Sequence, residues 1–123
     1  MPEAGQNIFK IARIVHENGT IKAFFHVNFE DQIFRGHFPG QPIIPGACLL
    51  QLIKEVLEDV LISTLLLKKA SQLKFINMIV PGDNDLVLEL SYKTVEDEIS
   101  VIGKLTNAEI ACFKFQGNFI AIF

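Results

Sequence analysis

Residues 36–62 read GHFPGQPIIPGACLLQLIKEVLEDVLI, a proline-rich loop that runs directly into a helical pattern. Three prolines within residues 39–45 exclude regular structure there, because proline fixes φ and lacks an N–H donor. From Gly46 to about Ile62, apolar residues recur at helical spacing and Pro45 marks the start. The apolar face consists of Leu49, Leu52, Ile53, Val56, Leu57, Val60 and Leu61, and the polar face of Gln51, Lys54, Glu55, Glu58 and Asp59. The sequence therefore predicts one amphipathic helix with a broad apolar face.

Segments on both sides of that helix have the spacing of β-strands. Asn18-Gly19 supplies the positive φ angles of a hairpin turn, and residues 81–85 (PGDND) form a turn by composition. The predicted strands are residues 7–15, 21–27, 71–79, 86–92, 99–106 and 108–123, the last bent near Gly117. With 123 residues, the chain fits a single domain over 1–123. Two strands, one long helix and a meander of strands predict an α+β fold, and periodicity alone leaves several such folds open.

Composition and charge exclude several classes of function. The net charge of −3 and the scattered Lys and Arg residues argue against nucleic-acid binding, because phosphates require a basic surplus. Two cysteines make neither a disulfide framework nor a zinc site. Residues 1–10 lack the apolar stretch of a signal peptide, and charges interrupt residues 43–67, so no membrane span is expected. We expect a cytoplasmic protein, and nothing in the sequence indicates a nucleotide, metal or organic cofactor.

Residues 36–46 resemble the signature of the 3-hydroxyacyl-acyl-carrier-protein dehydratases (FabZ/FabA-like). In that family a GHFP-type stretch precedes a second proline, then Pro-Gly, then the helix, and the spacing here matches through Gly46. Residues 75–86 (FINMIVPGDNDL) also resemble the family's strand that leads into a Pro-Gly-Asp turn. The resemblance covers nearly the whole chain and implies a hot-dog fold, in which a curled antiparallel sheet wraps around one long central helix. It also implies a homodimer or higher homo-oligomer that acts on acyl carrier protein in fatty-acid or related acyl-chain synthesis.

The loop and the helix start carry residues that suit dehydration of a 3-hydroxyacyl thioester. A base must remove the proton beside the carbonyl, and His37 is suitable because an imidazole exchanges protons near neutral pH. Gly46 opens the helix, so its N–H and the positive helix end can meet the thioester oxygen as enolate charge develops. The resemblance assigns these same roles to both residues. The predicted substrate contacts are Phe38, Pro39, Gly40 and Pro45. We interpret His16 and His26 as structural.

The sequence departs from the family on the helix. The dehydratases have a carboxylate fourteen residues after the histidine, where this chain has Gln51, and many have Gln one turn later, where it has Glu55. Glutamine can orient a group but cannot supply a proton at neutral pH. Three outcomes are open: His37 performs both proton transfers, Glu55 acts through a water held by Gln51, or the pocket binds acyl chains without dehydrating them. We favour retained dehydration by His37 with Gln51 as the orienting group.

Two other functions fit the same fold. One is a non-catalytic acyl-thioester-binding subunit, and the other is a hot-dog thioesterase in which Glu55 would activate water. Because carrier proteins are acidic, positive residues should surround the pocket mouth, and the candidates are Arg35, Lys68, Lys69 and Lys74. We interpret Cys48, in the first helical turn, as a small buried apolar residue. The phenylalanines are expected to fill the core, with some lining an acyl tunnel.

Overall fold

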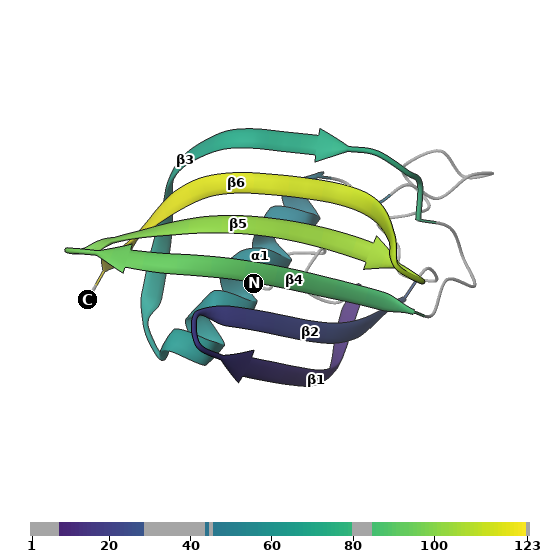
Figure 1. Cartoon of the computed structure of the whole chain (residues 1–123), viewed down its shortest axis with the longest axis horizontal. Coiled ribbons are helices and arrows are strands. Elements are labelled where there is room, and N and C mark those ends of the chain that lie inside the picture. The colour runs from purple at the N-terminus through teal and green to yellow at the C-terminus, as the bar shows by residue number, and fades with distance from the viewer. Residues whose placement is uncertain (1–7, 29–43, 45, 80–84, 123) are drawn as a thin grey trace.

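The computed structural model describes residues 8–28, 44, 46–79 and 85–122. Within this part of the chain, six strands form one antiparallel sheet that curls around a single helix (Figure 1). The elements are β1 (Phe9–Glu17), β2 (Thr20–Val27), α1 (Gly46–Leu61), β3 (Thr64–Phe75), β4 (Leu86–Val95), β5 (Glu98–Asn107) and β6 (Ile110–Ile122). The strand order across the sheet is β1-β2-β4-β5-β6-β3, so β1 and β3 are its edges. This is the predicted hot-dog architecture.

Helix α1 matches the prediction closely. It begins at Gly46 and ends at Leu61, and the next residue, Ile62, has a φ of 50° that stops the helix. Its buried residues are Cys48, Leu49, Leu52, Ile53, Val56 and Leu57. Burial of Cys48 confirms its interpretation as a core residue. None of the helical structure described is long and apolar enough to cross a membrane.

The β1–β2 hairpin is also as predicted. Asn18 and Gly19 have φ values of 47° and 78°, which are the angles of a tight hairpin turn. The predicted strands 86–92, 99–106 and 108–123 correspond to β4, β5 and β6 with bounds that differ by up to three residues.

The prediction for β3 was wrong at both ends. The strand was placed at 71–79, but it begins at Thr64 and ends at Phe75. Its pairing with β6 shifts register between Leu67 and Lys69 and again between Ala70 and Gln72. Each shift inserts a residue and disturbs the alternation of side chains, so the sequence pattern was not visible. Opposite the shifts lies Gly117, where a Cβ would stand only 2.5 Å from the Lys69 carbonyl oxygen, so glycine permits the close approach of the two strands.

The core fills the space between α1 and the concave face of the sheet. Its largest fully buried side chains include four phenylalanines, Phe25, Phe113, Phe115 and Phe119. The sheet has two distinct ends (Figure 1). We call one the turn end, where the β1–β2 and β4–β5 turns lie beside the last turn of α1. We call the other the helix-start end, where α1 begins, β3 ends and β5 turns into β6.

Candidate active site

The residues assigned to catalysis and substrate contact divide into two groups. His37 and the predicted contacts Phe38, Pro39, Gly40 and Pro45 lie outside the described residues, as does Arg35. Gly46, Gln51 and Glu55 are described, and all three lie on α1. The described part of the candidate site therefore consists of the helix and its neighbours.

Gly46 is the first residue of α1, at the end where backbone N–H groups have no partner within the helix. The first helical turn contains no acidic residue, so no side chain there compensates the positive end of the helix dipole. A Cβ at Gly46 would lie 3.4 Å from Cε2 of Phe75, an ordinary van der Waals distance. Gly19 is the one described glycine with a positive φ, so backbone conformation does not require glycine at position 46. Neither packing nor conformation of the described chain therefore explains this glycine.

Gln51 and Glu55 form a direct contact one helical turn apart. The Gln51 Nε2 donates a hydrogen bond to the Glu55 Oε1 at 3.2 Å, and both side chains are half-buried. Two turns after Gln51, Glu58 lies on the same helix face, and its Oε2 accepts a hydrogen bond from the Leu65 N–H of β3 at 2.8 Å. The Gln51–Glu55 pair therefore lies on the side of the helix that looks toward the open edge strand β3.

An apolar cavity of about 40 Å³ lies at the helix-start end. Its walls come from α1, from the end of β3 and from the start of β6, and are formed by Ile44, Leu49, Phe75, Asn77, Met78, Ile79, Cys112 and Phe113. Phe75 and Phe113 have ring centroids 5.0 Å apart, yet Phe75 is 52% exposed and Phe113 only 1%. The Asn77 Nδ2 donates to the Ala111 carbonyl oxygen at 2.8 Å and holds this segment against β6. The sequence did not reveal which phenylalanines line a cavity, because that depends on which strands meet there.

Strand β3 leaves one edge of the sheet unpaired within the described chain. Apolar side chains are exposed along it and just beyond it: Leu66, Leu73, Phe75, Ile76 and Met78, each between 40% and 52% exposed. A long edge strand with apolar side chains is a template for pairing with another chain. This surface continues directly from the wall of the cavity at Phe75.

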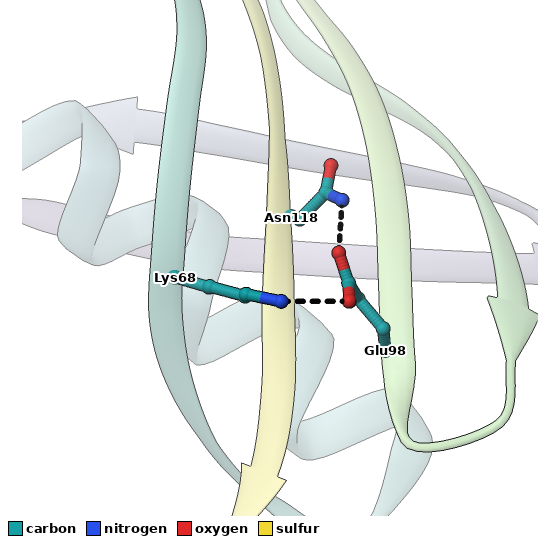
Figure 2. A network of polar contacts seen from close by, with 3 residues as sticks. All are labelled: Lys68, Glu98 and Asn118. Atoms are coloured by element: carbon teal, nitrogen blue, oxygen red, sulfur yellow. Dashed lines mark hydrogen bonds and ion pairs between the residues drawn. The ribbon is translucent and has the colours of Figure 1, made fainter.

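Polar groups at the turn end are satisfied by one another. Figure 2 shows Glu98 between two partners, with the Lys68 Nζ 3.0 Å from its Oε2 and the Asn118 amide donating to its Oε1. These two hydrogen bonds, Asn118 first, hold the pKa of Glu98 below its usual value. Of the predicted carrier contacts, Lys68 is therefore already paired, far from Gly46. Lys74, one residue before Phe75, is the described candidate that lies at the helix-start end.

A single helix inside a curled antiparallel sheet defines the hot-dog class, and a solved structure shares it. That structure is titled the dehydratase heterocomplex ApeI:P from Xenorhabdus doucetiae. It matches with a TM-score of 0.74 and 16% identity, over 90% of this chain and 96% of that one. The chain belongs to the ApeI-like family, described as ApeI dehydratase, which matches residues 13–116.

Curated relatives agree with this family. The 3-hydroxyacyl-(acyl-carrier-protein) dehydratase FabZ of Haemophilus influenzae (strain 86-028NP) is 30% identical over 108 residues, covering 78% of this chain and 71% of the relative. The enzyme of the same name from Clostridium acetobutylicum is 37% identical over 79 residues, covering 58% and 53%. The resemblance inferred from residues 36–46 and 75–86 is thereby confirmed at the level of the family.

Proposed function

We propose that this protein dehydrates 3-hydroxyacyl thioesters on acyl carrier protein to trans-2-enoyl thioesters, as a cytoplasmic hydro-lyase of fatty-acid or related acyl-chain synthesis. Membership of a dehydratase family supports the reaction class. One observation carries the proposal: α1 begins at Gly46, beside an apolar cavity, and His37 precedes Gly46 by nine residues in the sequence. A thioester could lie against this helix start, whose first N–H groups have no acceptor within the helix, with its acyl chain on the apolar walls.

In the proposed reaction, the His37 imidazole takes the proton from the carbon beside the thioester carbonyl. The electron pair moves toward the carbonyl oxygen, whose negative charge the Gly46 N–H and the helix start stabilise. The pair then forms the new carbon–carbon double bond as the bond to the β-hydroxyl breaks. The protonated His37 returns the proton to the leaving hydroxyl, which departs as water. Glycine at position 46 lets the thioester approach the backbone, which accounts for a residue that packing leaves unexplained.

Gln51 is proposed to orient the β-hydroxyl, with Glu55 as a positioning residue. The Glu55 carboxylate accepts one N–H of the Gln51 amide, which fixes the plane of that amide. The second N–H and the amide oxygen of Gln51 are then available to a hydroxyl group. Because an amide cannot supply a proton, both proton transfers fall to His37.

A second copy of the chain is proposed to complete the site. The cavity that the described residues line, of about 40 Å³, is well below the roughly 300–1,000 Å³ of ordinary ligand pockets, so a pocket for an acyl chain needs walls beyond these residues. Pairing β3 with β3 of another copy would satisfy the edge and cover its apolar residues. The Gln51–Glu55 face of α1 looks toward that same edge. A homodimer therefore accounts for the open edge and the incomplete pocket together.

Replacing His37 tests the proposal. We expect His37→Ala to lower turnover of a 3-hydroxyacyl carrier substrate by at least about 10²-fold, since general acid–base catalysis contributes that much or more. His26→Ala, in an exposed position on β2, serves as the control and should keep the wild-type rate. Unchanged turnover in His37→Ala would overturn the assignment.

A non-catalytic binding subunit is the second candidate, favoured by the amide at position 51. Gln51→Glu combined with Glu55→Gln distinguishes the two functions, because it supplies an acid at position 51 and keeps an amide at position 55 to form the hydrogen bond between the two side chains. If the site is catalytic, this variant should dehydrate faster than the wild type, on the order of tenfold or more. If wild type and variant both bind the acyl carrier without turnover, the binding subunit is the correct function. Release of free acid and thiol would instead identify a thioesterase.

A further inference from the structure

The convex face of the sheet carries a line of lysines near the helix-start end. The register places Lys104 of β5 opposite Lys114 of β6, and Lys114 opposite Lys74 of β3. All three side chains are exposed. We call these three residues the lysine row. Lys74 and Lys114 are 40 positions apart in the sequence. The pairing of β5, β6 and β3 brings the three lysines side by side.

Among the described cross-strand neighbours of the lysine row, one residue is acidic. Glu89 of β4 lies opposite Lys104, but on its other side it also lies opposite Lys22 of β2. The neighbouring positions on the same face are uncharged: Ser91, Ile102, Gln116 and Gln72 on one side, and Val87 and Thr106 on the other. Across the described ranges the one ion pair is Lys68–Glu98, at the turn end (Figure 2). Like charges directly opposite one another in a sheet are destabilising, so the Lys104–Lys114 and Lys114–Lys74 pairs cost stability, and no ion pair to these lysines is found among the described residues.

The lysine row lies close to the candidate active site. Lys74 immediately precedes Phe75, and successive strand residues point to opposite faces, so the lysine and the cavity wall share one stretch of β3. In Figure 1 the end of β3, the start of β6 and the end of β5 lie together at the end of the sheet where α1 begins. In the proposed homodimer the edge at β3 is paired, so a partner seated on the row would reach the helix start over the end of the sheet, where β5 turns into β6.

We infer that the lysine row docks an acidic surface of the carrier protein that delivers the acyl thioester. This inference rests on the proposed function and specifies where its macromolecular partner binds. Beside the row, Ile102 is 60% exposed, so the surface combines positive charge with an apolar contact, as a protein partner requires. A chain with a net charge of −3 would repel an extended polyanion but can still attract a compact acidic surface to one local patch.

Lys114→Glu is the sharpest test, because Lys114 lies between the other two lysines. The new carboxylate would sit opposite Lys104 and Lys74, so the unfolding midpoint should stay equal or rise. The KM for a 3-hydroxyacyl group on a bacterial acyl carrier protein should rise about tenfold at low ionic strength, while kcat stays unchanged. Turnover of the same acyl group on free pantetheine should not change. Lys93→Glu, an exposed lysine of β4 outside the row, is the matched control and should leave both substrates unaffected.

Equal KM values for wild type and Lys114→Glu on the carrier-linked substrate would overturn the docking surface. An equal rise in KM for the acyl group on free pantetheine would also overturn it. The same holds if the wild type binds heparin as tightly as it binds the carrier. If the wild type turns over neither substrate, the proposed function fails, and the surface is then tested by fluorescence anisotropy of the labelled carrier. Affinity about tenfold lower for Lys114→Glu would support the surface, and unchanged affinity would overturn it.

Discussion

The two ends of the sheet differ in how far the chain satisfies its own groups. At the turn end, Glu58 of α1 accepts the Leu65 N–H of β3, and Glu98 is held by Lys68 and Asn118. Each of these contacts joins two different elements of the fold. At the turn end, the chain itself therefore provides partners for these polar groups.

The helix-start end is left incomplete by the described chain. Gln51 and Glu55 bond to each other but stay half-exposed, Phe75 is 52% exposed, and the lysine row has no ion-pair partner within the described ranges. These exposed described groups are the surfaces at which substrate, a second copy and a carrier are proposed to bind. The difference between the two ends therefore supports the helix-start end as the candidate site.

Two phenylalanines in contact provide the strongest test of this difference. Phe113→Ala removes a ring that is 1% exposed and should lower the free energy of unfolding by about 3–5 kcal/mol. Phe75→Ala removes a ring that is half-exposed and should cost a single chain less than about 1 kcal/mol, while weakening the proposed dimer. Denaturant unfolding and sedimentation at several protein concentrations would measure both effects.

Equal losses of unfolding free energy in the two phenylalanine variants at a concentration where the protein is monomeric would contradict an open helix-start end. If the Phe75→Ala protein keeps the wild-type oligomeric state at every concentration, Phe75 does not contribute to the proposed dimer interface.

At the turn end, the link between α1 and β3 should have a moderate effect. Glu58→Ala deprives the N–H of the fully buried Leu65 of its acceptor, and should cost about 1–3 kcal/mol of unfolding free energy. Asp59→Ala, an exposed neighbour on the helix, is the control and should change stability little. Dehydration per folded molecule should stay at the wild-type value in both variants. A loss of kcat in Glu58→Ala would show that the two ends are not functionally separate.

The smallest effect is expected from Glu98 and is visible in its pH dependence. The Asn118 and Lys68 hydrogen bonds lower the pKa of Glu98 in the folded chain. A lowered folded-state pKa stabilises the fold at pH values above the unfolded pKa, and this gain disappears as pH falls through the folded pKa. The difference in unfolding midpoint between wild type and Glu98→Gln should therefore be small at neutral pH and vanish in acid. A difference in unfolding midpoint that grows toward low pH would contradict a lowered pKa of Glu98 in the folded chain.

Much of this architecture could be predicted from the sequence, and the failures have a common cause. Helix α1 was predicted because its apolar residues keep one period, and the hairpin because Asn18-Gly19 dictates its own backbone angles. The bounds of β3 were missed because two register shifts disturb its alternation. Local patterns reveal local structure, whereas irregularities that arise from pairing with a distant strand leave little trace in one segment.

The same limit applies to the candidate site. Gln51 and Glu55 are four residues apart on one helix, so their contact follows from helical geometry. The lysine row and the Phe75–Phe113 contact depend on the register between strands far apart in sequence, and no local pattern indicates them. The residues of the candidate site were therefore proposed from the sequence, whereas the surfaces around it became visible in the structure.

Mass spectrometry of the carrier-bound product tests the central claim most directly. After incubation with the wild-type protein, a 3-hydroxyacyl group on acyl carrier protein should lose the mass of one water molecule and remain attached to its carrier. The His37→Ala protein should leave the substrate unchanged over the same period. A carrier freed of its acyl group, or an unaltered substrate with the wild-type protein, would contradict dehydration at the helix-start end.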